Sequence, residues 1–284
     1  MPYFVSDQSY GKCALHLTKV SRTGARHSVD ELTVDIELDG DFSAAYTAAD
    51  NRLVVPTDTM KNTVYALAKQ HDITPIESFG QRIGQHFIGA FDHVTRATAR
   101  LTKQPWQRIL VDGSEHDHAF IGTSVERETA IVSSDRQSLQ ITSGLDSLSV
   151  LKTTRSGFCG FLRDRYTTLE ETADRILATT MTASWDSDRP DTDWTSCRRA
   201  VRRALVETFA EHDSASVQHT LYAMASAALD RCQNIQAITL EMPNQHRILV
   251  DLKPFELENV DEIFVATREP HGMISATVRR DSDP

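Results

Sequence analysis

The chain has 284 residues, of which 40% are apolar, so it is long enough to bury the core of one large globular domain or of two smaller ones. Its 30 basic and 40 acidic residues give a net charge of −10, which argues against nucleic acid or an anionic membrane as the main partner. A small anionic substrate stays compatible with this charge, because a few arginines can reverse the local field inside a pocket.

The cysteines are far apart in the sequence and form no CxxC pair, so we expect reduced thiols in a reducing compartment. They are Cys13, Cys159, Cys197 and Cys232. The sequence shows no apolar leader and no run of apolar residues long enough to span a membrane. It ends in Ser282-Asp283-Pro284 and not in a Ser-Lys-Leu-type peroxisomal address. These features predict a soluble, cytoplasmic protein.

The first half of the chain predicts a strand pair followed by two helices. Residues 32–38 alternate apolar and polar, which is typical of a half-buried antiparallel strand, and residues 11–20 are its expected partner. Two amphipathic helices follow, and Pro75 is expected in the first turn of the second helix. Their apolar stripes are Met60, Val64, Leu67 and Ala68, and then Ile76, Phe79, Ile83 and Phe87.

Strands are expected again at 94–104 and 119–132, on either side of the turn-rich segment at 112–114. The run Glu115-His116-Asp117-His118 has the composition of a metal site. Its expected place in a hairpin loop favours solvated side chains instead.

The second half repeats this order of elements. Expected elements are strands near 139–154 and 175–186, a loop at 186–191, helices near 192–211 and 217–232, and strands near 235–242, 246–252 and 273–279. The first of these helices is expected to bury Trp194, Cys197, Val201, Leu205 and Phe209 and to expose Arg198, Arg199, Arg202 and Arg203; the second is expected to bury Leu221, Met224, Ala228 and Cys232. Two copies of the pattern predict an α+β chain with antiparallel sheets, divided near 133–137 into domains 1–134 and 135–284.

Two polar pairs stand at expected helix starts, one in each half. Thr57-Asp58 precedes the first helix of the first half, and Val217-Gln218 begins the last helix of the second. A helix start exposes N–H groups and a positive potential that can hold an anion, although Thr and Asp there are also common N-caps. The two starts are plausible halves of one anion site.

The segment 150–169 mixes glycine, aromatic, charged and hydroxyl residues with no helix or strand period, so core packing alone does not explain it. Shortly after it comes Asp174-Arg175-Ile176-Leu177. Arg175 is either a surface arginine paired with Asp174 or Glu171, or a fork of donors that grips a planar anion in two places.

Together with four shorter blocks, the segment from 150 to 177 resembles the urate oxidases (uricases), and the resemblance runs from about residue 10 to about residue 279. The shorter blocks are Tyr10-Gly11-Lys12, Thr57-Asp58 before Lys61-Asn62-Thr63, Ser216-Val217-Gln218, and Pro243-Asn244-Gln245-His246. The resemblance implies two tandem T-fold (tunnelling-fold) domains, each with helices on one face of an antiparallel sheet. It also implies a multimeric β-barrel and a homotetramer with active sites at subunit interfaces.

The resemblance further implies oxidation of urate by O2 without metal or organic cofactor. Arg175 and Gln218 would clamp the substrate and Phe158 would stack on its ring, although Phe158 also suits an ordinary core position. Asn244 would face the place where dioxygen or water sits. In the family, the Thr-Asp pair and the Val-Gln pair of one site come from neighbouring subunits. The matching pairs in this sequence are Thr57-Asp58 and Val217-Gln218.

Lys12, Thr57 and His246 match the family's proton-relay residues. Without the resemblance, a lone histidine near a strand start is more often simply solvated. Asn244 and His246 are expected to straddle a turn and open a strand, and two residues of such spacing point to the same face.

Other classes of motif are missing from the sequence, which has neither a GxGxxG or GxxxxGK phosphate loop nor HExxH. One alternative is a T-fold pterin or purine hydrolase, which would need a metal and an anchoring Glu. The other is a purine-binding protein without oxidase activity, which would not need Lys12 and His246.

Overall fold

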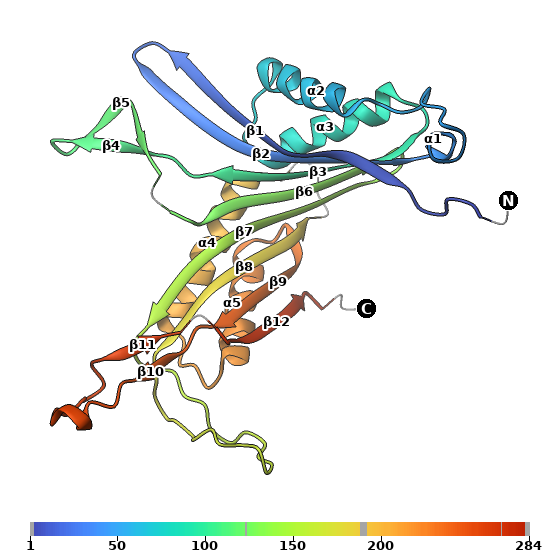
Figure 1. Cartoon of the computed structure of the whole chain (residues 1–284). Helices are drawn as coiled ribbons and strands as arrows, with labels where there is room; N and C mark the ends of the chain where they lie inside the picture. Colours follow the sequence, from blue (N-terminus) through green and yellow to red (C-terminus); the bar gives the residue numbers. More distant parts are fainter. Residues whose placement is uncertain (1–2, 123, 188–191, 268, 282–284) are drawn as a thin grey trace. The chain divides into compact units, whose positions relative to one another are not determined.

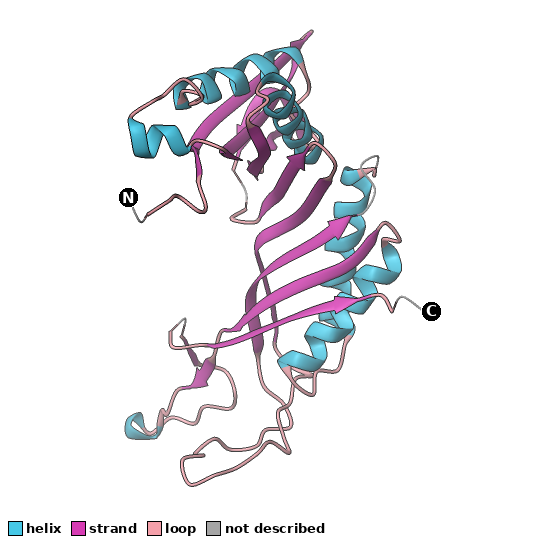
Figure 2. Ribbon diagram, turned by 90° about the vertical axis from the view of Figure 1, so that its right-hand side faces the viewer, coloured by secondary structure: helices cyan, strands magenta, loops and turns pink. Residues whose placement is uncertain are grey.

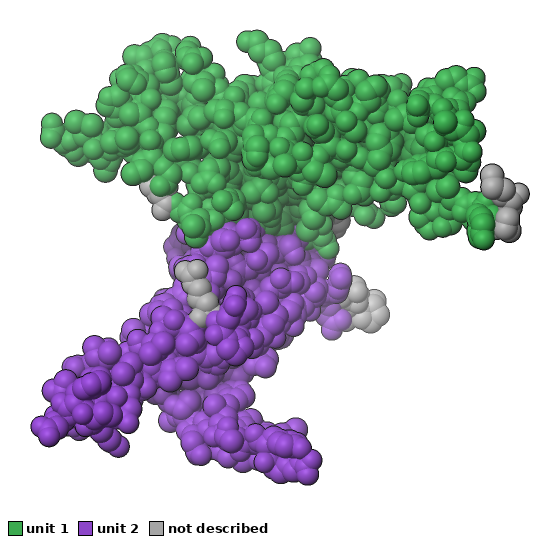
Figure 3. Space-filling model, in the orientation of Figure 1, with its two compact units in different colours: residues 1–144, 186–195 green, residues 145–185, 196–284 purple. Residues whose placement is uncertain are grey.

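The computed structural model describes residues 3–122, 124–187, 192–267 and 269–281 (Figure 1). Its contacts divide the chain into two compact units, shown in different colours in Figure 3. Unit 1 comprises residues 1–144 and 186–195, and unit 2 comprises residues 145–185 and 196–284. The division into tandem domains at 134/135 stays a prediction.

The described strands form one large sheet and two small hairpins. The large sheet has the order β1-β2-β3-β6-β7-β8-β9-β12, and its pairs β1–β2, β2–β3, β3–β6 and β9–β12 are antiparallel. Its strands are β1 (Ser9–Thr23), β2 (Arg26–Gly40), β3 (Val94–Gln104), β6 (Arg127–Asp135), β7 (Leu139–Lys152), β8 (Leu177–Ser187), β9 (Ile235–Asn244) and β12 (Gly272–Arg279). The small pairs are β4 (Gln107–Val111) with β5 (Ser114–Ile121), and β10 (Arg247–Leu249) with β11 (Phe264–Ala266). Since β1 and β12 stand at the edges, the described strands of one chain do not close into a barrel.

In unit 1 the helices α2 (Thr57–Gln70) and α3 (Ile76–Ala90) cover one face of the strands (Figure 2). The predicted alternation in β2 is confirmed, and so are both helical stripes, with Leu67 only partly buried. The buried side chains of β2 are Leu32, Val34, Ile36 and Leu38. Pro75 immediately precedes α3 and is not in its first turn. The short helix α1 (Ser43–Ala48) was not predicted.

In unit 2 the helices α4 (Trp194–Glu211) and α5 (Val217–Arg231) supply much of the core, as their spacing predicts. One expectation for α4 is wrong, because Arg198 is only 6% exposed. It lies three residues before the buried Val201, so helical geometry carries it towards the core face. Arg199, Arg202 and Arg203 are exposed as expected.

The expectation of four reduced thiols is also wrong. Cys197 of α4 and Cys232, which follows α5, form a disulfide with a Cα–Cα distance of 5.8 Å. Both side chains belong to the core that the two helices share, and this packing brings residues that are 35 positions apart into bonding range. Cys13 and Cys159 are free and exposed.

Short or irregular elements account for the other differences. The strand predicted at 119–132 is two strands, since 119–121 end β5 and β6 begins at Arg127. The strand predicted at 246–252 is reduced to β10, followed by a single 3₁₀ turn, η1 (Lys253–Phe255). Of the predicted loop at 186–191, the first two residues end β8 and 188–191 lie outside the described residues. Within the described part of the chain, no helix is long and apolar enough to cross a membrane.

Candidate functional site

The first group of predicted site residues lies at the start of β1 in unit 1. Half-buried Lys12 pairs with Ile36 of β2, and Tyr10 pairs with Leu38. Because Ile36 and Leu38 point into the core, Tyr10 and Lys12 face the helices. Gly11 between them has no room for a side chain, since a Cβ there would lie 1.8 Å from the backbone oxygen of Ile36.

A β-bulge follows Lys12. The register of β1 against β2 shifts between Lys12 and Leu15, and Ala14 adopts a φ of 53°. The N–H of Ala14 donates to Asp35 Oδ1 at 2.6 Å. A bulge redirects the side chains beside it. Lys12 therefore lies between Gly11, which is in close contact with β2, and the bulge at Ala14, which the hydrogen bond to Asp35 fixes.

Thr57 and Asp58 occupy the first turn of α2, and both are exposed. The N-cap position is taken by Pro56, which makes no side-chain capping bond. Neither predicted site residue is therefore used as the N-cap. Their position beside the free N–H groups of the helix start fits the predicted anion-binding role.

Asp58 at the start of α2 interacts electrostatically with lysines of both α2 and β1. The carboxylate of Asp58 accepts hydrogen bonds from Lys61 Nζ and, at 2.9 Å, from Asn62 Nδ2. The pKa of Asp58 is lowered first by the Lys61 hydrogen bond and then by the Lys61 charge, with a smaller contribution from the charge of Lys12. Lys12 therefore lies within electrostatic reach of the α2 start.

The second group lies in unit 2, around a tightly hydrogen-bonded loop. Phe158 exchanges two backbone hydrogen bonds with Thr172, of 2.8 and 3.1 Å. Gly157 N–H donates to the Ser214 carbonyl at 2.8 Å, which ties the same loop to the segment that leads into α5. A Cβ on Gly157 would lie 2.9 Å from the Ala173 carbonyl oxygen, so only glycine fits here.

Arg175 lies over the aromatic ring of this loop. Its Cζ is 5.3 Å from the centre of the Phe158 ring, and its Nε is buried without a hydrogen-bond partner among the described residues. Burial lowers the pKa of Arg175. Asp174 and Glu171, the expected surface partners, instead bind the Ser156 N–H at 3.1 Å and the Gly160 N–H at 3.1 Å. Their carboxylates are engaged in holding the loop.

The start of α5 agrees with the prediction. Ser216 is the N-cap, and its side chain accepts the His219 N–H at 3.1 Å. Val217 is buried and anchors the first turn, whereas Gln218 is exposed. The amide of Gln218 is thus free to face solvent or a ligand at a helix start.

Asn244 ends β9, and exposed His246 lies just before β10, so the turn comes one residue later than expected. Gln245 between them ties the turn to β8, because its N–H donates to the Ala178 carbonyl at 3.0 Å and its Nε2 contacts Thr180 Oγ1 at 3.0 Å. The strand β8 begins directly after Arg175 and Ile176.

A cavity of about 380 Å³ lies against the Phe158 loop, lined among others by Gly157, Phe158, Asp213 and Ser214.

The predicted site residues fall into two sets, one in each unit. Lys12, Thr57 and Asp58 belong to unit 1; Phe158, Arg175, Val217, Gln218, Asn244 and His246 belong to unit 2.

Comparison with known proteins identifies the family. The family model described as "Uricase" matches residues 8–133 and 141–275. The chain belongs to the uricase family. The uricase of Arthrobacter globiformis is 42% identical over 98% of this chain and 90% of its own length, and that of Aspergillus flavus is 40% identical over 96% of each. The crystal structure of the Arthrobacter globiformis uricase aligns with a TM-score of 0.95 at 41% identity, covering 100% of this chain and 97% of that one.

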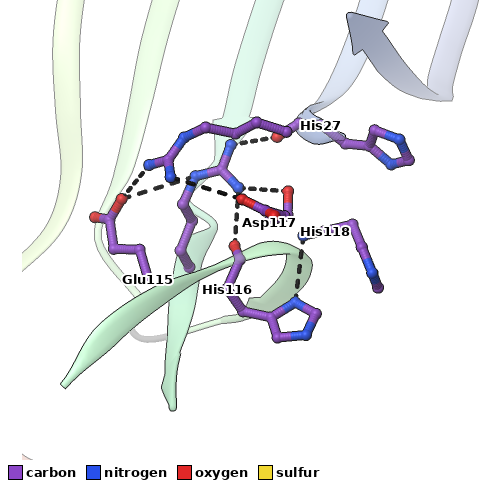
Figure 4. Close-up of polar contacts among 7 residues, drawn as sticks. His27, Glu115, His116, Asp117 and His118 are labelled. Atoms are coloured by element: carbon purple, nitrogen blue, oxygen red, sulfur yellow. Dashed lines mark hydrogen bonds and ion pairs between the residues drawn. The ribbon is translucent and has the colours of Figure 1, made fainter. Parts of the chain in front are cut away.

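One set of residues with metal-site composition takes no part in the two groups of predicted site residues. The residues 115–118 belong to strand β5 and not to a loop, which corrects the prediction (Figure 4). Glu115 pairs with Arg26, and the His116 and His118 rings are 4.5 Å apart, edge to face. Arg108 donates to the carbonyls of His116 at 3.0 Å and of Asp117 at 2.7 Å. Within the described ranges, no group of three or more His, Cys, Asp or Glu side chains is placed to hold a metal ion.

The sequence did not reveal two sets of contacts that hold the uricase-like blocks around Lys12, Thr57 and Phe158 in place. They are the hydrogen bonds between the Tyr10 hydroxyl and Val55, and the ion pair between Arg155 and Asp213, which are 58 residues apart. The one sequence signal for Tyr10 and Arg155 is that both stand within the blocks that resemble the uricases.

Proposed function

We propose that this protein is a urate oxidase that converts urate, O2 and H2O to 5-hydroxyisourate and H2O2. The observation that carries the proposal is Arg175, whose buried Nε has no hydrogen-bond partner among the described residues and lies beside the Phe158 ring in a chain of the uricase family. A buried donor without a partner is costly, and a planar anion on the ring face would satisfy it.

The residues of unit 2 suit substrate binding. Arg175 offers parallel N–H donors, and Gln218 offers a donor and an acceptor that complement a ureide edge. Phe158 stacks on the flat ring, and Val217 and Asn244 complete the surroundings, with Asn244 facing dioxygen or water.

The predicted site residues of unit 1, together with His246 of unit 2, suit proton removal. In the proposal Lys12, Thr57 and His246 relay protons, and Thr57 and Asp58 meet the substrate at the positive start of α2. Once doubly deprotonated, urate is electron-rich enough to reduce O2, so the protein supplies deprotonation, orientation and a small polar cage. We propose that neither metal nor organic cofactor is needed, because the sequence has none of the usual binding motifs for them.

We further propose a cytoplasmic homotetramer that binds neither nucleic acid nor membrane. Each active site would take Lys12 and Thr57-Asp58 from one subunit and the unit 2 residues from its neighbour. The sheet edges at β1 and β12 support such an assembly, because a barrel built from several chains would cover them.

The test is the loss of urate absorbance in air together with the appearance of H2O2, measured with and without a chelator. We expect equal rates in both. Activity that is lost to the chelator and restored by a metal ion would contradict the cofactor-free mechanism. Binding of urate without any oxidation would favour the alternative of a T-fold purine-binding protein.

A further inference from the structure

The side chain of Tyr10 connects the two elements that carry Lys12 and Thr57. Its hydroxyl donates to the Val55 carbonyl at 3.1 Å and accepts the Val55 N–H at 2.7 Å. A single hydroxyl therefore holds both backbone groups of one residue. This pair of hydrogen bonds links β1 to the segment that leads into α2, across 45 positions of sequence.

The two ends of this link are each two residues from a relay residue. Tyr10 precedes Lys12 on the same face of β1, and Val55 precedes Thr57 across Pro56. The backbone between each anchor and its relay residue has little conformational freedom. Pro56, between Val55 and Thr57, has a fixed φ, and Gly11, between Tyr10 and Lys12, lies in close contact with β2.

The aromatic ring of Tyr10 is itself held in place. It packs edge to face against buried Phe42, with ring centres 4.7 Å apart and planes at 90°. Val55 is 3% exposed, so the hydrogen bonds are shielded from competing water. The link is thus rigid at both ends.

We propose that Tyr10 is a positioning residue that fixes the distance between Lys12 and Thr57 through its paired hydrogen bonds to Val55. The inference rests on the proposed function, in which Lys12 and Thr57 pass a proton. Proton transfer is sensitive to changes of a few tenths of an ångström in the donor–acceptor distance, whereas Arg175 and Gln218, which are proposed to clamp the substrate, belong to the other unit.

The test is Tyr10→Phe, which keeps the ring on Phe42 and removes only the hydroxyl. We expect turnover to fall about 10- to 100-fold, the scale of a small misplacement of reacting groups. The affinity for a urate analogue that cannot be oxidised should stay within about threefold of the parent's, because the substitution leaves Arg175 and Gln218 unchanged. Tyr65→Phe is the matched control, since Tyr65 is an exposed tyrosine of α2, and its turnover should equal the parent's.

A second variant tests the link from its other end. Val55→Pro deletes the N–H that donates to Tyr10 and keeps the tyrosine, so we expect the same pattern with a smaller loss of turnover. A folded Tyr10→Phe with parental turnover would overturn the proposal, and so would a parallel loss of analogue affinity. If neither variant folds, the hydroxyl serves the fold itself and the positioning role is likewise overturned.

The parent protein, assayed alongside, separates this proposal from the one it rests on. If the parent oxidises urate and Tyr10→Phe does so equally well, only the positioning role fails. If the parent leaves urate unchanged, the proposed function fails, and the relay that Tyr10 would position fails with it.

Discussion

At the residue scale, the proposed substrate site depends most on Arg175. Its guanidinium is half-buried, and among the described residues the two acids nearest in sequence, Asp174 and Glu171, bind backbone N–H groups of the Phe158 loop instead. We expect Arg175→Ala to weaken the binding of a urate analogue by on the order of 2–5 kcal/mol, measured by calorimetry. Arg175→Lys should recover only part of this loss, because an ammonium cannot form two parallel hydrogen bonds.

The control is Arg163→Ala in the same loop. Arg163 is exposed and lies 5.0 Å from the Phe161 ring, so it resembles Arg175 in its aromatic contact but not in its burial. Unchanged analogue binding by Arg175→Ala would show that Arg175 is only a surface residue.

Lys12 is expected to act on protons and not on binding. Lys12→Met keeps the alkyl stem and removes the amine. Positioned proton transfer contributes about 100- to 10,000-fold, so turnover should fall by that order while analogue affinity stays within about tenfold. A variant that loses affinity and turnover in equal measure would place Lys12 in the binding site instead.

The pH dependence of stability should involve His212. Its pKa is lowered first by burial and then by the charges of His219 and Lys152. The unfolded chain, with an ordinary histidine pKa of about 6.5, then binds more protons than the folded one, so stability falls as the pH drops below that value. The charges of Asp213 and Arg155, which pair close by, partly offset each other.

His212→Gln removes this titration. We expect its thermal midpoint to change less between pH 7.5 and 5.5 than that of the parent, while the control variant His16→Gln, at an exposed position of β1, behaves as the parent does. Equal slopes for parent and His212→Gln would assign the acid sensitivity to other groups.

At the element scale, α4 and α5 are joined by the Cys197–Cys232 disulfide, which closes a 35-residue separation. A cross-link of this span should stabilise unit 2 by about 2–4 kcal/mol, chiefly by restricting the unfolded chain. We expect a reductant to lower the thermal midpoint of the parent, and the double variant Cys197→Ala/Cys232→Ala to have the lowered midpoint with and without reductant.

Thiol titration of the unreduced, denatured protein gives an independent check. Two thiols, those of Cys13 and Cys159, should react. Four reactive thiols, together with a midpoint that does not respond to reductant, would mean that the sulfurs stay reduced.

The elements that the sequence predicted well are those with a long apolar period. The alternation of β2 and the stripes of α2, α3 and α5 are properties of a local pattern that one buried face imposes. The elements that it missed have no such period. The hairpin β10–β11 has only three residues in each strand. Arg198 lies three residues before Val201 on the core face of α4, but an arginine breaks the apolar pattern by which such a face is recognised.

The candidate site shows the same division. Thr57 and Val217 begin helices, where the sequence marks boundaries, and so their local placement was predictable, whereas Asn244 ends a strand that it was not expected to belong to. The contacts that hold them were not predictable, because Tyr10 meets Val55 across 45 residues. Such pairs are decided by tertiary packing, and a single sequence carries no direct signal of them.

At the scale of the whole molecule, exposed apolar side chains support the proposed assembly. Ile248, Leu249, Ile263 and Val265, on or beside the β10–β11 hairpin, are 44–56% exposed. Several large apolar side chains exposed on one small element often mark a surface that a partner covers. In the proposed homotetramer that partner is another copy of the chain.

Subunit mixing tests whether each active site is shared between chains. Thr57→Val and Arg175→Ala should each be inactive alone. If a site takes Thr57 from one chain and Arg175 from its neighbour, refolding the two variants together creates some interfaces in which both contributing residues are native, and activity should partly return. Mass spectrometry must first show that mixed tetramers form. Mixed tetramers that stay inactive would contradict the proposed sharing, since a site built within one chain always keeps one of the two substitutions.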